Sequence, residues 1–251
     1  MLAIERKNEI LAMLKQEGSV LVAPLALRFG VAEETIRRDL EKLEQEGLAK
    51  KTYGGAVLAS GTSSDASYRV RAKTNTKQKS IIADKVFDLV SDGENILMDA
   101  SSTSVLIAKK LKQKKKLTIL TNSVEILLDF ADNKNATVIS TGGVLRDSSL
   151  SLVGRDAERV IENYTADKAI ISCKGIDFEK GVTESNIAEA EVKKAMAANA
   201  KYVVLALDSS KFGSLSFARL IDLKNVHTVV TDEMPSKEWQ EYFKANGITL
   251  L

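Results

Sequence analysis

The segment FGVAEETIRRDL, residues 29–40, restricts the folding of the first part of the chain more than any other stretch. Gly30 permits the backbone conformation of a tight turn between helices, and the apolar Val31 can fix that turn against a core. Residues Glu33–Gln45 follow without glycine or proline, with apolar residues spaced as i, i+4 and i+7. These three residues, which predict one buried helix face, are Ile36, Leu40 and Leu43.

The opposite face of this predicted helix carries a hydroxyl group and several cations. A helix-turn-helix presents such groups to the major groove and the phosphates of DNA, on a second helix that is held firmly from behind. The segment therefore predicts a DNA-reading helix, and a β-wing is predicted to follow it. On this interpretation the DNA-facing residues are Glu33, Glu34, Thr35, Arg37, Arg38, Lys42, Lys50, Lys51, Tyr53 and Gly54.

The flanking sequence supports this interpretation. An apolar stripe predicts a helix over Ala3–Glu17, and a second helix is predicted after the apolar run Val20–Val22. Pro24 is compatible with that second helix only in its first turn. A strand is predicted over Leu48–Thr52, and the glycines after it predict the tight end of the wing. The alternative is a small helical bundle with a solvated, charged face.

Net charge does not decide between these alternatives. Residues 1–55 contain nine lysines and arginines and nine acidic residues, and the whole chain has a formal net charge of +2. A DNA-binding domain is usually strongly basic. Because the acidic residues gather late in the predicted reading helix, we expect the local arrangement of cations, and not the net charge, to support DNA binding.

From residue 77 onward the sequence alternates between helical and strand patterns. Strands that are apolar throughout and separated by helices are typical of a parallel sheet with helices on both faces, so we expect an α/β fold of the Rossmann-like kind. The predicted strands are Asn95–Asp99, Lys116–Leu120, Ala136–Ser140, Ala169–Ser172, Tyr202–Leu207 and Val226–Thr231. The predicted helices are Lys77–Val90, Ser104–Leu111, Val124–Phe130, Ala188–Ala198 and Lys237–Ala245.

The loops after five of these strands are rich in hydroxyl groups, glycine and charge. In such sheets ligands bind at the carboxyl ends of the strands. The first loop, Asp99–Thr103, directly precedes a helix, where hydroxyls and free backbone amides can hold an anion. Together the loops suit a small polyol that carries a phosphate group. The candidate binding residues are Asp99, Ser101, Ser102, Thr103, Thr121, Asn122, Gly142, Gly143, Lys174, Gly175 and Lys211.

Length and composition set the outer limits of the fold. With 251 residues, of which 44% are hydrophobic, the chain has room for two domains with proper cores. The small, polar segment Ser60–Asp65 predicts a flexible joint. We therefore expect a DNA-binding domain over residues 1–57, a linker over residues 58–76 and a second domain over residues 77–251.

The sequence also bears on compartment and chemistry. It begins without the pattern of a secretory signal, and no apolar run approaches the roughly 20 residues of a membrane span. The single cysteine, Cys173, fits a reducing compartment, so we expect a cytoplasmic protein without membrane contact. Cys173 and His227 are the only residues of their types, which argues against a zinc site and against Cys–His catalysis. We expect no metal and no cofactor.

The segment GVAEETIRRDLEKLEQEG, followed by KKTYGGA, resembles the winged helix-turn-helix of the DeoR family of bacterial sugar-metabolism repressors. The family usually has Ser where this chain has Ala32, and His where it has Tyr53. Leu21 stands where a capping Ser or Thr is common. Because the loss of an N-cap costs about 1 kcal/mol, we expect weaker helix ends or a different operator.

The resemblance continues along the chain. The segments DASST, TNS, TGG, EAEVKKAM and DSSKFG occur in the order of the family's effector-binding domain, which is similar to ribose-5-phosphate isomerase. At residues 99–103 the family usually has Asp-Ser-Gly-Thr-Thr, so this chain keeps the hydroxyls and lacks the glycine. The match adds Glu189 to the candidate effector-binding residues. Glu189 and Lys193, spaced i and i+4, could equally form a simple surface ion pair.

Two functions remain open at this point. The resemblance implies a non-enzymatic repressor of sugar-metabolism genes, which releases operator DNA when its second domain binds a phosphorylated sugar. Two-fold operators imply a homodimer or a higher homo-oligomer. The alternative is a sugar-phosphate isomerase with an appended helical domain, and such an enzyme needs a carboxylate base such as Asp99, Asp177 or Glu189. A DNA-reading module joined to a sugar-phosphate fold favours the regulator.

Overall fold

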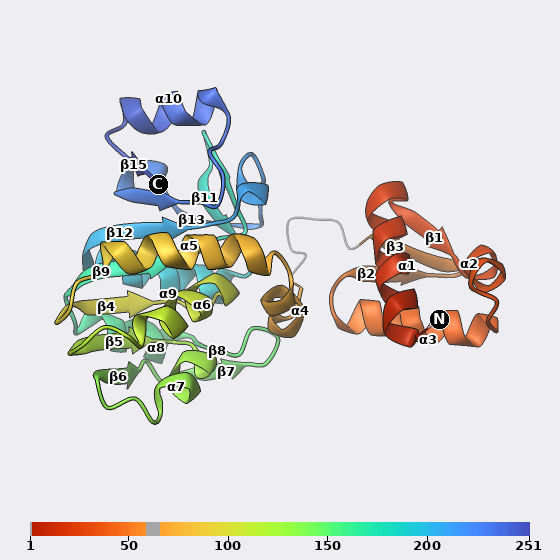
Figure 1. The fold of residues 1–251 in the computed structure, drawn as a ribbon, viewed down its shortest axis with the longest axis horizontal. Helices are drawn as coiled ribbons and strands as arrows, with labels where there is room; N and C mark the ends of the chain where they lie inside the picture. The colour runs from red at the N-terminus through yellow and green to blue at the C-terminus, as the bar shows by residue number, and fades with distance from the viewer. Residues whose placement is uncertain (1, 59–65) are drawn as a thin grey trace. The chain divides into compact units, whose positions relative to one another are not determined.

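The computed structural model describes residues 2–58 and 66–251 of the chain (Figure 1). The chain divides into two compact units, Met1–Val70 and Arg71–Leu251, and each is described by itself. The segment Ser60–Asp65, predicted to be a flexible joint, lies outside the described residues. Within the predicted linker, Tyr68–Lys73 forms the short helix α4.

Residues 2–58 fold into three helices and a three-stranded antiparallel sheet in the order β1-β3-β2 (Figure 1). The helices are α1 (Ala3–Glu17), α2 (Val22–Phe29) and α3 (Glu33–Gln45), and the strands are β1 (Ser19–Leu21), β2 (Ala49–Thr52) and β3 (Gly55–Leu58). Helices α2 and α3 with the turn between them form a helix-turn-helix, and β2 and β3 form the wing. The predicted winged helix-turn-helix is confirmed, in place of a simple helical bundle.

The apolar stripe of α3 is fully buried, as its spacing predicts. It comprises Ile36, Leu40 and Leu43. The other two helices contribute Ile10, Leu14 and Leu25 to the same core. A buried ion pair also ties α1 to α3, because Arg6 Nε lies 2.5 Å from Asp39 Oδ2. Removal of either partner alone would leave an uncompensated charge inside the protein.

The helices of the motif begin without side-chain caps. Leu21 and Ala32 occupy the N-cap positions of α2 and α3, and neither side chain accepts a capping hydrogen bond. Pro24 is the third residue of α2 and therefore lies in its first turn, where a missing amide removes no intrahelical hydrogen bond. Gly30 ends α2 with a φ of 63°, the conformation that the inter-helix turn requires.

The second unit is built on a seven-stranded parallel sheet in the order β15-β14-β12-β9-β4-β5-β6. Its strands are β4 (Asn95–Met98), β5 (Leu117–Thr121), β6 (Ala136–Ser140), β9 (Ala166–Ile171), β12 (Ala200–Ala206), β14 (Thr228–Val230) and β15 (Thr249–Leu250). Helices cover both faces of the sheet, so the predicted α/β fold is confirmed.

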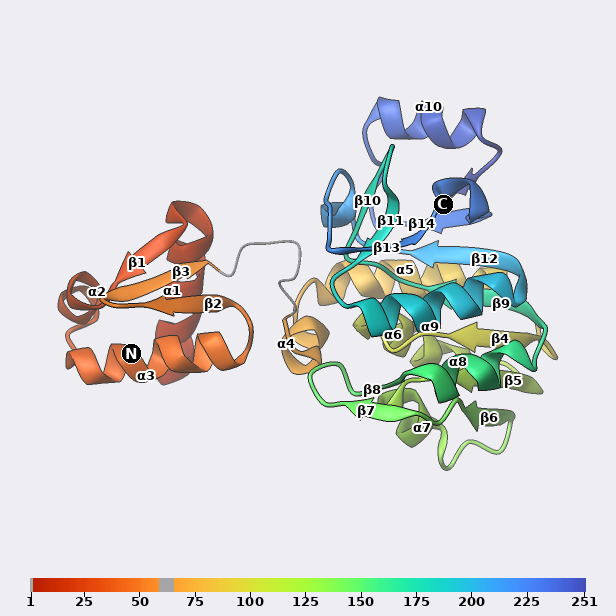
Figure 2. The same cartoon turned by 180° about the vertical axis from the view of Figure 1, so that it is seen from behind.

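Figures 1 and 2 show which helices cover each face. Helices α5 (Thr76–Leu89), α6 (Ser102–Leu111) and α7 (Val124–Phe130) lie on one face of the sheet. Helices α8 (Arg155–Glu162) and α9 (Ile187–Ala198) lie on the other. Helix α10 (Lys237–Ala245) packs beside β15. The central strands β4 and β9 are thereby closed off from solvent over most of their length.

Several short elements are not predicted by the sequence. Strands β7 (Val144–Arg146) and β8 (Ser151–Val153) form a hairpin after β6. Strands β10 (Gly175–Asp177), β11 (Gly181–Glu184) and β13 (Ala218–Ile221) form a second, antiparallel sheet. Helix α8 and the edge strand β15 are also not predicted by the sequence. Strands of two to four residues offer too few positions for an alternating pattern to be recognised.

Gly55 provides a test of the wing. A Cβ atom there would lie 1.9 Å from the carbonyl oxygen of Val20 in β1, whereas one at Gly54 would meet no heavy atom within 4 Å. Because backbone atoms cannot yield without breaking the β1–β3 pairing, we expect Gly55→Ala to destabilise the unit by at least about 2 kcal/mol. Gly54→Ala should change its stability by less than about 0.5 kcal/mol. Native-state hydrogen exchange of residues 2–58 measures both, and equal protection would contradict the packing described.

Candidate DNA-reading face and effector site

The exposed face of α3 carries most of the predicted DNA-reading residues. Arg37 and Arg38 are exposed, and Thr35 is half-buried. Each arginine pairs with a glutamate one turn earlier: Arg37 Nη2 lies 3.1 Å from Glu33 Oε2, and Arg38 Nε lies 3.4 Å from Glu34 Oε1. Exposed i,i+4 pairs of this kind contribute only a few tenths of a kcal/mol. The arginines can therefore exchange these glutamates for phosphates or bases at little cost.

The acidic residues late in α3 are largely engaged within the unit. Asp39 is buried in the ion pair with α1, and Glu46 Oε1 lies 2.6 Å from Nζ of Lys7, also in α1. Glu41 Oε1 lies 3.7 Å from Nζ of Lys51 in the wing. These three acidic residues are thus paired with cations of α1 and of the wing. They do not neutralise the cations on the exposed face of α3.

The wing presents the remaining predicted DNA-reading residues. Tyr53 and Gly54 form its tip, and the side chain of Tyr53 is fully open to solvent. Lys50 and Lys51 are exposed on β2, and Lys42 is exposed on α3. Of the ten residues predicted to face DNA, nine are therefore exposed on α3 and the wing, and the tenth is half-buried.

The five predicted ligand-binding loops follow β4, β5, β6, β9 and β12, whose carboxyl ends lie at one edge of the parallel sheet. The strand order separates these loops. Gly142 and Gly143, after the edge strand β6, lie four strand positions from Lys211, after β12. Four spacings of about 4.8 Å amount to roughly 19 Å, which exceeds the length of a monosaccharide phosphate. The predicted residues therefore form more than one cluster.

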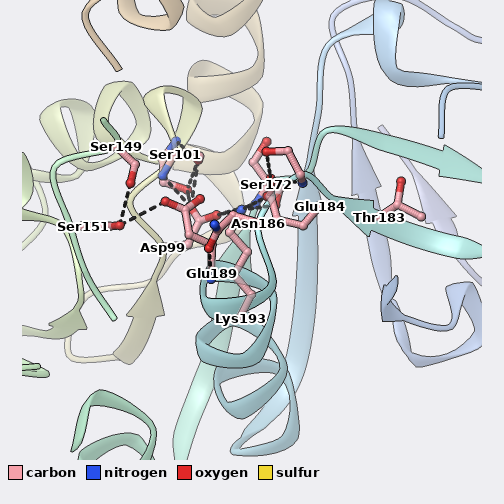
Figure 3. Close-up of polar contacts among 12 residues, drawn as sticks. Asp99, Ser101, Ser149, Ser151, Ser172, Thr183, Glu184, Asn186, Glu189 and Lys193 are labelled. Carbon is pink, nitrogen blue, oxygen red and sulfur yellow. Dashed lines mark hydrogen bonds and ion pairs between the residues drawn. The ribbon is translucent and has the colours of Figure 1, made fainter. Parts of the chain in front are cut away.

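Asp99 organises the loop after β4 from a fully buried position (Figure 3). Its Oδ1 accepts hydrogen bonds from the amide of Ser101 at 3.3 Å, from the hydroxyl of Ser101 at 2.8 Å and from the hydroxyl of Ser104. Its Oδ2 accepts the amide of Ser172 at 3.1 Å and lies 3.0 Å from Nζ of Lys193. Both carboxylate oxygens are thus engaged inside the protein.

The same loop leads directly into α6. Ser101 is the N-cap of this helix, and its hydroxyl accepts the amide of Ser104 at 3.0 Å. Ser102 and Thr103 are the first two residues of the helix, where backbone amides have no intrahelical acceptor. Their free amides and the helix dipole make this a favourable place for a negatively charged group.

Lys193 of α9 joins three segments of the sheet edge (Figure 3). Its Nζ lies 3.0 Å from Asp99 Oδ2 and 2.5 Å from Glu184 Oε2, and it donates to the carbonyl oxygen of Ser172 at 3.0 Å. The three charged residues are at most 5% exposed. Burial alone lowers the pKa of Lys193, but Glu184 and Asp99 outweigh it and raise that pKa above its ordinary value. Burial likewise raises the pKa of Glu184, yet Lys193 and Lys174 hold it below its ordinary value.

Glu189 does not form the surface ion pair with Lys193 that the i,i+4 spacing allows. It is buried, and its Oε1 accepts a hydrogen bond from the hydroxyl of Ser151 at 3.0 Å (Figure 3). The same oxygen accepts a hydrogen bond from Nη1 of Arg146 at 3.3 Å. Arg146 also donates to the hydroxyl of Ser149 at 2.9 Å. The surface-pair alternative is wrong, because both side chains are buried with other partners. Glu189 instead fastens the β7–β8 hairpin to α9.

Thr121 and Asn122 fix the loop after β5. The hydroxyl of Thr121 donates to the carbonyl of Met98 at 2.7 Å and accepts the amide of Ser123 at 3.1 Å. Asn122 Nδ2 donates to the carbonyl of Leu152 at 3.1 Å, whereas its buried Oδ1 has no hydrogen-bond partner within the described residues. A buried acceptor without a donor costs about 1–3 kcal/mol, and a ligand hydroxyl would relieve that cost.

Several charged residues act on Lys79, near the loop after β12. Lys79 of α5 is buried and donates to two backbone carbonyls of the chain just before α5, at 2.5 and 2.6 Å. Burial lowers the pKa of Lys79 to about 8; Asp208 opposes this shift, while Lys211, Arg71 and Lys174 add to it. These positive charges are thus close enough to repel one another, with one carboxylate among them.

The chain entering α5 is tied to the same loop. Asn75 Nδ2 donates to Asp208 Oδ1 at 3.2 Å. On its other side the loop contacts α10, because Phe212, the neighbour of Lys211, packs edge-on against Trp239 with ring centroids 5.4 Å apart. The loop that carries Lys211 is therefore held between α10 and the residues that precede α5.

Close backbone packing accounts for two of the predicted glycines. A Cβ atom at Gly143 would lie 2.7 Å from the carbonyl oxygen of Val153, and one at Gly175 would lie 2.2 Å from that of Ser214. Gly142, in contrast, has open space around it. Packing therefore requires glycine at Gly143 and Gly175, whereas Gly142 is explained by its φ of 62°, in the left-handed region that favours glycine.

Cys173 and His227 lie apart, in different structural surroundings. Burial raises the pKa of the Cys173 thiol to about 12. His227 Nδ1 accepts the amide of Val203 at 3.0 Å, and its ring stacks on Tyr202 with centroids 4.8 Å apart. Within the described residues, no group of three His, Cys, Asp or Glu side chains is placed to hold a metal ion. No helix in residues 2–58 or 66–251 is long and apolar enough to cross a membrane.

Three charged residues of this edge are not predicted by the sequence: Lys79, Arg146 and Glu184. Lys79 carries a detectable signal, because it stands on the apolar stripe of α5 with Ile82 and Ala83, at i, i+3 and i+4. A charged residue on such a stripe must find partners inside the fold. Arg146 and Glu184 lie in strands of three and four residues, which show no comparable pattern.

Comparison with known protein families accounts for both units. A model described as the DeoR-like helix-turn-helix domain matches residues 6–62, and one described as the DeoR C terminal sensor domain matches residues 74–233. The chain belongs to the DeoR family. The amino-terminal unit of this DeoR-family regulator is therefore its DNA-binding domain, and the second unit is its sensor domain.

The relatives of this chain are similar over nearly their whole length. The regulator YulB of Bacillus subtilis is 39% identical, over 92% of this chain and 90% of its own. GolR of Listeria innocua is 34% identical over 99% and 98%, and the glycerol-3-phosphate regulon repressor of Escherichia coli is 30% identical over 92% and 91%. Among solved structures, ribose 5-phosphate isomerase A of Methanocaldococcus jannaschii is a distant neighbour, with 16% identity, a TM-score of 0.41 and 55% of each chain covered.

The buried charges around Lys193 predict a large effect on stability. We expect Lys193→Met to lower the free energy of unfolding by about 3–5 kcal/mol, because Asp99 and Glu184 would remain buried without their cation. Lys194→Met, which removes an exposed pair with Glu191, should cost less than about 0.5 kcal/mol. Urea denaturation compares the two variants, and a similar loss for both would show that the buried pairs do not stabilise the edge.

The exposed arginines of α3 predict a specific effect on DNA binding. We expect Arg38→Ala to weaken binding to DNA selected from a random-sequence pool about tenfold, because a major-groove contact contributes about 1–3 kcal/mol. Arg155→Ala, which removes an equally exposed arginine of the sensor domain, also paired with a glutamate, should leave affinity unchanged. Gel-shift titration at constant salt measures both, and unchanged affinity for Arg38→Ala would contradict the assignment of α3.

Proposed function

We propose that this protein is a repressor of sugar-metabolism genes, and that a phosphorylated sugar bound at the carboxyl edge of the sensor sheet releases it from operator DNA. Membership of the DeoR family supports the division into DNA binding and sensing. One relative is named as the repressor of a glycerol-3-phosphate regulon. The observation that carries the choice of a phosphorylated ligand is the position of Lys174 and Lys211 after the adjacent strands β9 and β12, where both also act on the buried Lys79.

The proposed effector spans the loops after β12, β9 and β4. Lys211 and Lys174 bind its phosphate, since they follow the adjacent strands β12 and β9. Two strand spacings, roughly 10 Å, separate the β12 loop from the start of α6, where Ser102 and Thr103 bind the sugar. The unpaired Oδ1 of Asn122 accepts a further hydroxyl. This arrangement combines two lysines, the amino terminus of α6 and the unpaired oxygen of Asn122.

In this proposal, other residues predicted to bind the effector hold the surrounding loops in place instead. Asp99 has both oxygens engaged, so it holds the β4 loop and does not touch the effector. Glu189 holds the β7–β8 hairpin in the same way. Thr121 and Gly143 support the neighbouring loops. The effector is thus enclosed by loops whose shapes are set by buried hydrogen bonds.

The proposed signal leaves the site through the chain before α5. Asn75 is bonded to Asp208, and Lys79 is bonded to the carbonyls of Arg71 and Thr74, where the sensor unit begins. A phosphate among the cations changes the balance of charge that holds these contacts. Because a ligand shifts an equilibrium only through unequal affinity for two arrangements, the effector must favour the arrangement that binds DNA less well.

The proposal does not include catalysis. A general base needs a carboxylate oxygen within reach of the substrate proton. Asp99 is buried with both oxygens bonded to protein groups, and Glu189 is buried with its Oε1 bonded to Ser151 and Arg146. Asp177, the third candidate base, accepts the amides of Glu179 and Lys180, both at 2.9 Å, in the β10–β11 turn. Each carboxylate therefore has a structural task that accounts for it.

We also propose that the protein acts in the cytoplasm as a homodimer or a higher homo-oligomer. Repressors of this kind read two-fold related half-sites, which one helix-turn-helix alone does not fill. The sensor domain then controls the spacing between the two reading helices. No cofactor enters this scheme, since the effector itself supplies the change in charge.

A titration of DNA release tests the proposal. Labelled operator DNA bound to the protein is titrated with phosphorylated aldoses, ketoses and polyols, and release is followed by fluorescence anisotropy. We expect Lys211→Ala to bind DNA normally and to need at least about tenfold more effector, because a charge-assisted contact to the phosphate is lost. Lys180→Ala, at an exposed lysine of the β10–β11 turn, serves as the control.

Asn75→Ala separates sensing from transmission in the same titration. This variant should still be stabilised by the effector in a thermal-shift assay, since it keeps Lys174 and Lys211. It should release DNA less completely, because the bond to Asp208 is gone. A normal response of Lys211→Ala, or turnover of the sugar phosphate by the purified protein, would overturn the proposed function.

A further inference from the structure

A pocket lies at the amino edge of the sensor sheet, opposite the proposed effector site. It has a volume of about 450 Å³ and lies at the amino ends of β5 and β6, between the segment 115–118 and the segment 134–137. The loops of the proposed effector site follow the carboxyl ends of the parallel strands, so the two sites are separated by the length of a strand, roughly 15 Å. The function proposed above makes no use of this pocket.

Three lysines gather at this pocket: Lys115, Lys116 and Lys134. No carboxylate within the described residues forms an ion pair with any of them. Among residues 2–58 and 66–251, the one acidic side chain bonded to this stretch is Asp92, whose Oδ1 accepts the backbone amide of Lys115 at 2.9 Å. All three lysine side chains are exposed, so their positive charge is open to an anion from solvent.

The neighbouring lysines behave differently. Lys109 and Lys112 lie 3.7 and 3.6 Å from Asp129, and Lys110 pairs with Asp84. Lys114 lies over the ring of Phe87, 4.0 Å from its centroid. These four neighbouring lysines thus have partners within the protein, whereas the side chains of the three lysines that line the pocket have no ion-pair partner within the described residues. The unbalanced positive charge of this stretch is therefore concentrated at the pocket.

The backbone at the pocket is also strained. Lys116 has a φ of 58°, in the left-handed region that favours glycine or asparagine. Its amide donates to the carbonyl of Asn135 at 2.7 Å, which joins the two segments that form the pocket. Strained positions of this kind persist where the surrounding structure requires them, and they gather at binding sites.

We propose that this site, the lysine pocket, binds a small polyanion with two or more phosphate groups. Its volume lies within the range of small-ligand sites. Three ammonium groups match several negative charges better than one, and lysine binds phosphate as a point charge. The hydroxyls of Thr118 and Thr137 and the amide of Asn135 line the same pocket and can orient the ligand. Phosphates of a DNA backbone share this chemistry and are distinguished by the test.

Calorimetric titration of the full-length protein with inorganic tripolyphosphate tests the proposal. We expect one tripolyphosphate to bind per chain, and the variant K115Q/K116Q/K134Q to bind it at least tenfold more weakly. The control K180Q/K201Q/K237Q carries the same change in charge at three exposed lysines outside the pocket, and should bind as the unmodified protein does. Lys211→Ala should also bind normally, which keeps this result independent of the effector site. Thermal unfolding confirms that the variants are folded.

Four results would overturn the proposal. Tripolyphosphate could bind the pocket variant as tightly as the unmodified protein. It could lose affinity equally in the control variant, which would indicate a general effect of charge. It could lose affinity with Lys211→Ala, which would assign the binding to the effector site. Finally, the unmodified protein could fail to bind tripolyphosphate while the pocket variant loses affinity for DNA, which would make the lysines a contact for the DNA backbone.

Discussion

The ammonium group of Lys193 between two buried carboxylates is the interaction on which the carboxyl edge of the sensor sheet depends. Asp99 comes from the end of β4, Glu184 from β11 and Lys193 from α9, so one cation joins the central sheet, the small second sheet and a helix. Buried charges are stable only when they compensate one another and are fully hydrogen-bonded. The positions of the loops at this edge therefore depend on one buried cation that is shared by two carboxylates.

Local periodicity explains how much of the fold is predictable from the sequence. Helix α3 has a complete apolar stripe, and its observed bounds are the predicted ones. The β7–β8 hairpin has no such local pattern, because its contacts come from Asn122 and Glu189, 30 and 38 residues away. The candidate site is likewise only partly predictable from local sequence. The loops at strand ends are recognisable by composition, whereas the partners of Lys193 depend on the topology of the whole sheet.

In both domains, the net charge does not show how the charged side chains are distributed. The DNA-binding domain is formally neutral, yet three of its acidic residues form ion pairs that join α3 to α1 or to the wing. The sensor domain has lysines at two separate edges of one sheet, in the loops after β9 and β12 and at the amino ends of β5 and β6. The parallel sheet separates these two groups of lysines by the length of a strand.

The contact between Phe212 and Trp239 gives the protein a built-in optical probe. Trp239 is the single tryptophan of the chain, and its indole also stacks on Phe178 with centroids 3.8 Å apart. Any rearrangement of the neighbouring loop alters the surroundings of that indole. Its emission spectrum therefore reports on the loop without an attached dye, and the signal is free of contributions from the DNA-binding domain.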